Sequence, residues 1–263
     1  MFSGKGILKL IIDTQELIRL SKERAPLPCG GQAYMASTTA QELFRTRSKE
    51  TGRPAYWVPS IRGVHQAEIM SRKEWRNLAK AHSKWNYGGT SLYSDRLLVE
   101  FGSDYPPVVE FGHRAISKII NEEKTWLFPM CAGAARVKFG SEMRGRVEYV
   151  AESNVRCSPL VGGVIKTALP MFHAFSKKYT FKKDYRNSLN DIFILATSGH
   201  LGIPLLTRDK LLARFAEECL GSRLMGVQGC ELISPQKGVG ERRVMKESRK
   251  YVNRSWRIIQ TRR

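Results

Sequence analysis

Apolar and polar residues alternate along the first fifty positions in a way that predicts a strand followed by helices. The apolar run from Ile7 to Ile12 predicts a strand that ends at Asp13, and the amphipathic stretch 14–23 predicts a helix. Pro and Gly residues at 26–31 predict a loop, and a second helix is expected at about 39–50. This order of elements indicates an α/β chain.

The same kind of pattern returns from about residue 181 onwards. Asp191–Thr197 predicts a largely buried helix that Gly202 ends, Ile203–Thr207 predicts a strand, and Lys210–Cys219 predicts another helix. Strands that alternate with helices favour a parallel sheet. We therefore expect the two ends of the chain to share one α/β core with a central parallel sheet.

The region between these ends is less regular. Residues 51–180 hold many aromatic and turn-forming residues, and the segments 136–139 and 146–150 alternate as strands do, around a Gly-containing turn. We divide the chain accordingly. A discontinuous core comprises residues 1–50 and 181–233, a large insertion of mixed α/β character comprises 51–180, and a basic tail comprises 234–263.

Four acidic residues stand at the ends of the predicted elements. Asp13 and Asp209 each end a predicted strand, and Glu42 and Asp191 lie near predicted helix starts. Ligands bind beyond the carboxyl ends of the strands in open parallel sheets. Carboxylates gathered there would repel one another by ~1–4 kcal/mol per pair at about 4 Å. A hard divalent cation bound by oxygen ligands is the usual compensation.

Helix capping is the alternative role for each of these acids. Asp13 and Asp209 are both suited to begin the helix that follows them, and residues 39–42 and 188–191 both have the spacing of a capping box. Each acid alone is weak evidence for a site. The set is stronger, because all four fall at strand ends or helix starts of one α/β pattern.

The overall charge points to a polyanionic partner. Lys and Arg total 44 against 24 Asp and Glu, which gives a formal net charge of +20 and a pI of about 10.0. Such a balance favours nucleic acid or an anionic membrane as partner, although a basic protein kept soluble by its charge is the alternative. An acidic pocket inside a basic chain indicates phosphodiester chemistry on a polyanion.

Two basic segments are candidates for nucleic-acid contact. Residues 237–263 carry ten Lys or Arg and two Glu, interleaved with aromatic residues, as phosphate neutralisation and base stacking require. The alternative for this tail is a C-terminal helix that docks an apolar stripe on the domain. The second segment is a basic helix face within 72–84, for which a solvated helix with buried tryptophans is the alternative. The candidate contacts are Arg72, Lys73, Arg76, Arg242, Arg243, Lys250, Arg254 and Trp256.

Cysteine usage and hydropathy restrict the remaining classes. The five cysteines are scattered and form no C-x-x-C pair, so neither a zinc ribbon nor a disulfide framework is indicated. The cytoplasm or another reducing intracellular compartment fits best. No segment has the length of a membrane span, so no membrane partner is expected.

Four segments of the chain resemble the motifs of the PIN-domain ribonucleases. Residues 11–18 look like the first strand with its Asp, and residues 37–43 look like the second acidic motif. Residues 190–198 look like the third motif, in which Asp opens a buried helix, and residues 202–209 look like the closing strand with Thr-x-Asp. The last two are the most specific. Gln15 departs from the Asn that the family often has, and Glu42 and Asp191 are 149 residues apart, which exceeds the spacing of compact members.

The resemblance implies a three-layer α/β/α PIN-like domain with endoribonuclease activity. Asp13, Glu42, Asp191 and Asp209 would hold Mg²⁺ or Mn²⁺ and support hydrolysis of RNA to 5′-phosphate and 3′-hydroxyl ends, with Thr14 and Thr207 offering hydroxyls nearby. RNA would be the substrate, and a protein inhibitor or ribonucleoprotein would be a possible partner. Two alternatives remain open at this point: an RNA-binding scaffold with an inactive PIN-like fold, and a structure-selective DNA nuclease.

Overall fold

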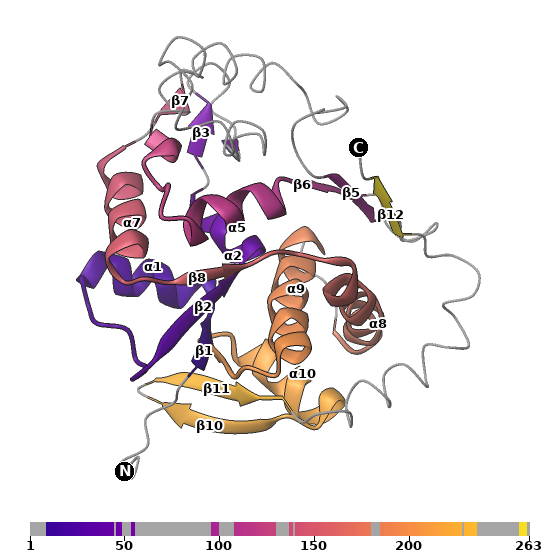
Figure 1. Cartoon of the computed structure of the whole chain (residues 1–263). Coiled ribbons are helices and arrows are strands. Elements are labelled where there is room, and N and C mark those ends of the chain that lie inside the picture. The colour runs from indigo at the N-terminus through magenta and orange to yellow at the C-terminus, as the bar shows by residue number, and fades with distance from the viewer. Residues whose placement is uncertain are drawn as a thin grey trace.

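The computed structural model describes residues 9–44, 46–48, 54–55, 96–99, 108–129, 137–138, 140–179, 185–227, 229–235 and 258–261. Within these residues, a six-stranded sheet forms the centre of an α/β fold (Figure 1). In spatial order its strands are β10 (Arg223–Val227), β11 (Cys230–Ser234), β9 (Leu205–Thr207), β1 (Lys9–Ile12), β2 (Gln32–Ala36) and β8 (Arg156–Ser158).

The sheet is mixed, which corrects the expectation of a parallel sheet. Strands β9, β1, β2 and β8 are parallel, whereas β11 runs antiparallel to β9, and β10 runs antiparallel to β11. A short connection can join antiparallel strands but not parallel ones. Only two residues separate β10 from β11, and Gly229 in that turn has a φ of 79°. The tight turn therefore fixes the antiparallel edge.

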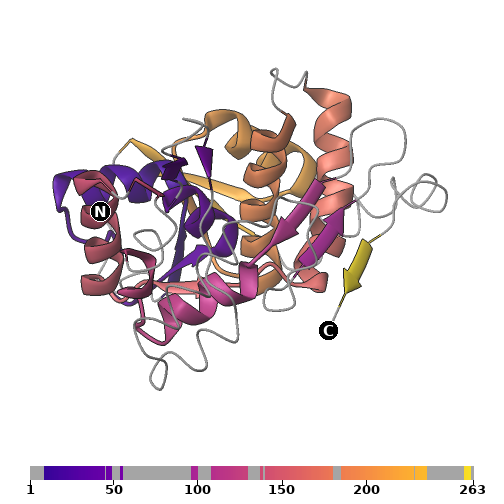
Figure 2. The same cartoon turned by 90° about the horizontal axis from the view of Figure 1, so that it is seen from above.

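Helices cover both faces of the sheet (Figures 1 and 2). On one face the hydrophobic core includes residues of α1, α2, α5 and α7, and on the other it includes residues of α8, α9 and α10. Strand β1 shows the division, because Leu10 and Ile12 pack into the first core and Ile11 packs into the second. The bounds are α1 (Thr14–Glu23), α2 (Ser37–Leu43), α5 (His113–Asn121), α7 (Ser141–Glu152), α8 (Gly162–Lys178), α9 (Tyr185–Leu201) and α10 (Lys210–Leu220).

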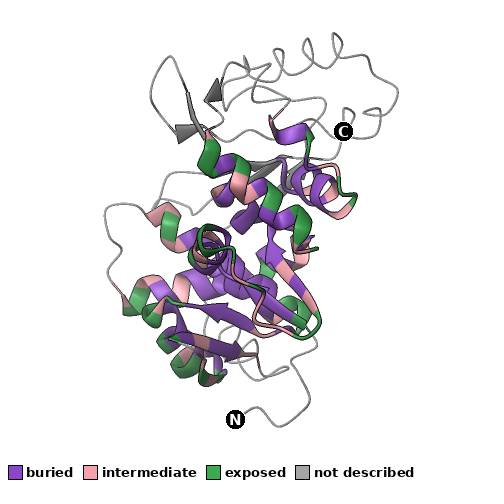
Figure 3. Cartoon of the chain, turned by 90° about the vertical axis from the view of Figure 1, so that its left-hand side faces the viewer, coloured by how far each residue is buried: buried purple, intermediate pink, exposed green. Residues whose placement is uncertain are grey.

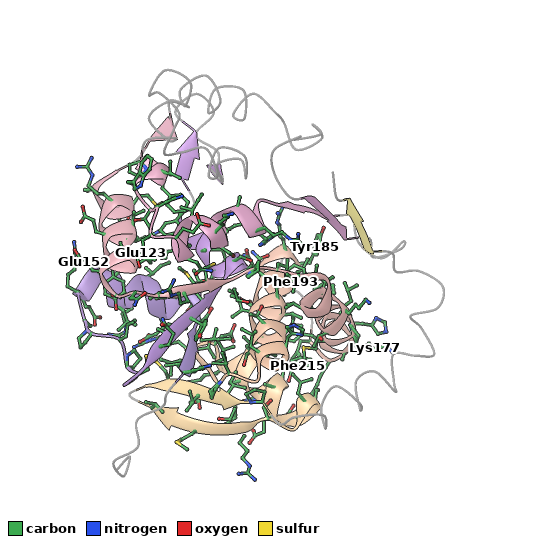
Figure 4. All side chains as sticks on the ribbon, in the orientation of Figure 1. Glu123, Glu152, Lys177, Tyr185, Phe193 and Phe215 are labelled. Carbon is green, nitrogen blue, oxygen red and sulfur yellow. The ribbon has the colours of Figure 1, made fainter. Side chains whose placement is uncertain are left out.

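Large apolar side chains fill the space between the layers. The central strands are buried and exposed positions lie on the outer helix faces (Figure 3). Phe193 of α9 and Phe215 of α10 are both 0 % exposed, and Figure 4 shows them inside the helical layer on that side. Phe215 also meets the ring of Phe175 of α8 edge-on at a centroid distance of 5.1 Å. This ring contact joins α8 to α10, and Phe193 of α9 is buried in the same hydrophobic core.

The predicted elements at the two ends of the chain are largely confirmed. β1 and α1 occupy the predicted positions, α9 contains the predicted helix 191–197, and β9 and α10 follow it. Gly202 stands just beyond α9 with a φ of 65°, as a helix-ending glycine does. Strand β2 was not predicted, and α2 begins at Ser37 and ends at Leu43, which is earlier at both ends than expected.

The predicted strand at 146–150 is wrong, because these residues lie inside α7. Met143, Val147 and Val150 are buried at helical spacing, and Arg146 pairs with Glu142 at 2.5 Å, one turn earlier. The strand predicted at 136–139 exists in part, as β7 (Val137–Lys138). The buried positions of residues 146–150 therefore follow the helical period of 3.6 residues and not the strand period of 2.

Much of the described middle region belongs to the core rather than to a separate unit. β8 is an edge strand of the main sheet, and α5, α7 and α8 contribute buried residues to its two faces. Two smaller three-stranded sheets are also described. One contains β4 (Pro54–Ala55), β3 (Thr46–Ser48) and β7, and the other contains β12 (Ile258–Thr261), β5 (Arg96–Val99) and β6 (Val108–Phe111). Within the basic tail, residues 258–261 thus form a strand rather than a helix.

Candidate active site

The sheet topology creates a switch point between β1 and β9. The chain passes from β1 to β2 and on to β8 in one direction, and then returns to place β9 on the other side of β1. Ligands of open α/β sheets bind outside the carboxyl ends of the strands at such a point. Asp13 directly follows β1, and Asp209 follows β9 by two residues. Two of the four acids therefore lie where the fold favours a site.

Asp13 is almost completely buried, at 4 % exposure, and occupies the N-cap position of α1. Its Oδ1 accepts a hydrogen bond from the backbone N–H of Thr14 at 2.6 Å, and its Oδ2 accepts one from the Thr207 hydroxyl at 2.8 Å. The pKa of Asp13 is raised to about 6, mainly by burial and also by the charges of Glu42 and Asp209, while these two hydrogen bonds lower it. Capping and participation in the cluster thus coexist at this residue.

Glu42 does not form the capping box that its spacing allows. Helix α2 begins at Ser37 without a side-chain cap, and the half-buried Glu42 lies near its end. Its Oε2 accepts a hydrogen bond from the Thr14 hydroxyl at 2.7 Å, and its Oε1 accepts one from Asn190 Nδ2 at 2.8 Å. Both carboxylate oxygens are therefore oriented by side chains from other helices.

Asp191 is also not a helix cap, since α9 begins at Tyr185 and Asp191 lies in its second turn. The pKa of Asp191 is raised to about 8, first by burial and then by the charges of Asp13, Glu42 and Asp209. Among the described residues, no donor forms a hydrogen bond with its carboxylate, and no cation contributes to this shift. Of the four acids, Asp191 is the one that the neighbouring residues stabilise least as an anion.

Asp209 is a helix cap. Its Oδ1 accepts hydrogen bonds from the backbone N–H groups of Leu211 and Leu212 at 2.8 and 3.0 Å, at the start of α10. Its own N–H donates to the Thr207 hydroxyl at 3.0 Å, and that hydroxyl donates in turn to Asp13. Capping therefore accounts for the Asp209 carboxylate, while its backbone connects it to the cluster.

A chain of hydrogen bonds joins the elements that carry the acids. It runs from the Asp209 backbone through Thr207 to Asp13, and Thr14 continues it by bonding both Asp13 and Glu42. Asn190, next to Asp191, completes it. The sequence indicated the four acids and the two threonine hydroxyls, but it did not indicate Asn190. The only signal was its place beside Asp191.

The chemistry of this donor set fits a hard cation, because all four side chains offer oxygen and repel one another. In the part of the chain that the structure describes, however, no three His, Cys, Asp or Glu side chains already stand together as a ligand group. The charges of neighbouring acids raise the pKa values of Asp13 and Asp191, but the described side chains do not form a complete coordination shell for a metal ion.

The eight candidate nucleic-acid contacts all lie outside the described residues. Arg72, Lys73 and Arg76 fall in the gap between β4 and β5, and the remaining five precede β12 in the tail. Their predicted role stays a prediction.

No family model, curated protein or solved structure matches the chain. None of the helices among the described residues has the length and apolar character needed to cross a bilayer.

Proposed function

We propose that this protein is a metal-dependent endoribonuclease built on a PIN-like core. The observation that carries the proposal is the placing of Asp13, Glu42, Asp191 and Asp209 around the switch point of the sheet, where burial, together with the charges of neighbouring acids, raises the pKa of Asp191 to about 8 and that of Asp13 to about 6. The net charge of +20 supports a polyanionic substrate. The preference for RNA rests on the motif resemblance.

In this proposal the four carboxylates hold Mg²⁺ or Mn²⁺. The ion would supply an activated water and stabilise negative charge on the phosphate and the leaving oxygen. The protein's own residues keep the ligands in place: Thr207 orients Asp13, and Thr14 and Asn190 orient Glu42. Asp191, without a hydrogen-bond donor among the described residues, is the acid with most to gain from a bound cation.

The test uses the full chain with single-stranded RNA and with DNA of the same sequence, in Mn²⁺, Mg²⁺ or EDTA. We expect cleavage of RNA that leaves 5′-phosphates and is lost in EDTA and in the Asp191→Asn variant, while RNA binding persists. Glu217→Gln, at an exposed position of α10, is the matched control for removal of one carboxylate. Full activity in folded Asp191→Asn would contradict the metal site, and cleavage of DNA alone would favour a DNA nuclease.

A second candidate function is an RNA-binding scaffold without turnover. It is favoured by the hydrogen bonds that three of the carboxylates accept from protein donors, by the helix-capping role of Asp209, and by the lack of a completed ligand group among the described residues. RNA binding that persists without any cleavage in Mn²⁺ or Mg²⁺ would establish this alternative.

A further inference from the structure

Two arginines pair with one buried carboxylate, that of Glu16, in the elements that also carry Asp13 and Asp209. Glu16, in the first turn of α1 and three residues after Asp13, is only 2 % exposed. Arg208 Nε donates to its Oε2 at 2.7 Å, and Arg19 donates to both carboxylate oxygens, with Nη2 at 2.6 Å from Oε1. A buried carboxylate requires such partners, because an unpaired buried charge is very costly.

The two arginines differ in how many carboxylates pair with them and in how many of their N–H groups donate to described residues. Arg19 also pairs with Glu23, one turn further along α1, so two carboxylates neutralise it. Arg208 has Glu16 as its only described acidic partner and contacts it through Nε alone. Its two Nη groups donate to no described residue, and its side chain is 39 % exposed. The network thus fixes one edge of the Arg208 guanidinium and leaves the other edge open.

Arg208 is adjacent along the chain to two residues of the proposed site. It stands between Thr207, which donates to Asp13, and Asp209, which caps α10. Its anchor, Glu16, lies one helical turn from Asp13, about 5 Å along the axis of α1. A guanidinium with two free Nη groups matches a phosphate in geometry and charge.

We propose that Arg208 is a phosphate-binding residue, oriented by Glu16, that donates its free Nη groups to a phosphodiester of an RNA strand lying across the carboxyl ends of β1 and β9. This inference rests on the proposed function, because it takes RNA as the ligand. Glu16 is then a positioning residue, which acts on the substrate only through Arg208.

The experiment measures binding of a fluorescein-labelled single-stranded RNA 12-mer by anisotropy, in EDTA and over a series of salt concentrations. The full chain is compared with Arg208→Gln, with Arg208→Lys and with Arg19→Gln. Arg19→Gln is the matched control, because it removes the other guanidinium from the same carboxylate. Circular dichroism and thermal unfolding verify that each variant is folded, and Arg208→Lys keeps a cation beside Glu16 in case Arg208→Gln is unstable.

We expect Arg208→Gln to weaken RNA binding about tenfold and to reduce the slope of log K against log salt by about 0.7, the value of one phosphate contact on a single strand. Arg208→Lys should keep most of the slope but lose part of the affinity, and Arg19→Gln should change neither. In cleavage assays with Mn²⁺, the effect of Arg208→Gln should appear mainly in KM.

Affinity and salt slope in Arg208→Gln that equal those of Arg19→Gln would overturn the inference, since a purely structural ion pair predicts equal effects. A wild-type chain that binds RNA but does not cleave it would refute the nuclease proposal, while the binding comparison would still decide the role of Arg208. A wild-type chain without salt-dependent RNA binding would overturn both.

Discussion

Replacing Asp191 by Asn should stabilise the protein at neutral pH in the absence of metal. The folded chain raises the pKa of Asp191 from its ordinary value of 3.8 to about 8, first by burial and then by the charges of the other three acids. A carboxyl with a raised pKa contributes stability that is fully present below the unfolded pKa and is lost as the pH rises through the folded pKa. Asn does not ionise, so the variant avoids this loss.

The structure sets the size of the effect. Each pH unit between the two pKa values is worth about 1.4 kcal/mol, which gives an upper bound of ~4 kcal/mol at about pH 7. Asp191 is half-buried and titrates together with Asp13, and both facts reduce the figure. We therefore expect Asp191→Asn to raise the free energy of unfolding by ~2 kcal/mol at about pH 7 to 8, and by little near pH 4.

Urea denaturation in EDTA, followed by circular dichroism between about pH 4 and 8, measures this difference. Glu217→Gln serves as the control, because it removes an exposed carboxylate of α10 and should show no such pH dependence. Adding Mn²⁺ should then stabilise the wild-type chain more than Asp191→Asn, since a ligand that binds only the folded state shifts its apparent stability. An Asp191→Asn variant that is no more stable than wild type, or whose advantage does not change with pH, would refute the electrostatic reasoning.

Three further substitutions probe the same structure. Thr207→Val should raise the pKa of Asp13 above about 6 and lower stability by ~1–3 kcal/mol, because Asp13 and the Asp209 N–H each lose a partner; NMR titration and urea denaturation measure the two effects. Thr39→Val should be neutral or stabilising by up to ~1 kcal/mol in the same denaturation assay, because the buried Thr39 hydroxyl has no hydrogen-bond partner among the described residues. Gly221→Ala should destabilise by ~1 kcal/mol in chemical denaturation, because Gly221 ends α10 with a φ of 64°, and equal stability would contradict this cap.

The sequence predicts those elements whose local pattern agrees with their final environment. β1 is an apolar run and α1 an amphipathic segment, so both were predicted. Strand β2 was not, because Gln32–Ala36 contains no β-branched residue and follows a Pro- and Gly-rich loop. Its strand conformation depends on pairing with β1 on one side and β8 on the other. Long-range pairing of this kind leaves little trace in local sequence.

The same distinction applies to the candidate site: the sequence indicated some of its residues, and only the tertiary fold shows the others. Asp13 and Asp209 were identified by their places after predicted strands, and the structure confirms those places. The hydrogen bond from Asn190 to Glu42 spans 148 residues, and no local pattern indicates it. The ion pair between Arg208 and Glu16 spans 192 residues and was missed for the same reason. Contacts that only the tertiary fold creates decide which of the polar residues act together.

Helix capping explains why this fold tolerates two of its four acids, and it does not explain the others. Asp13 and Asp209 accept backbone N–H groups at helix starts, where negative charge is stabilised by the helix dipole. Asp191 has no such compensation among the described residues, and its neighbours raise the free energy of its charged form. A protein that used this surface only as a scaffold would be more stable with Asn at the same position. The proposed cation would make the arrangement favourable, so the cost of Asp191 in the metal-free protein is an argument for the metal-dependent function that we propose.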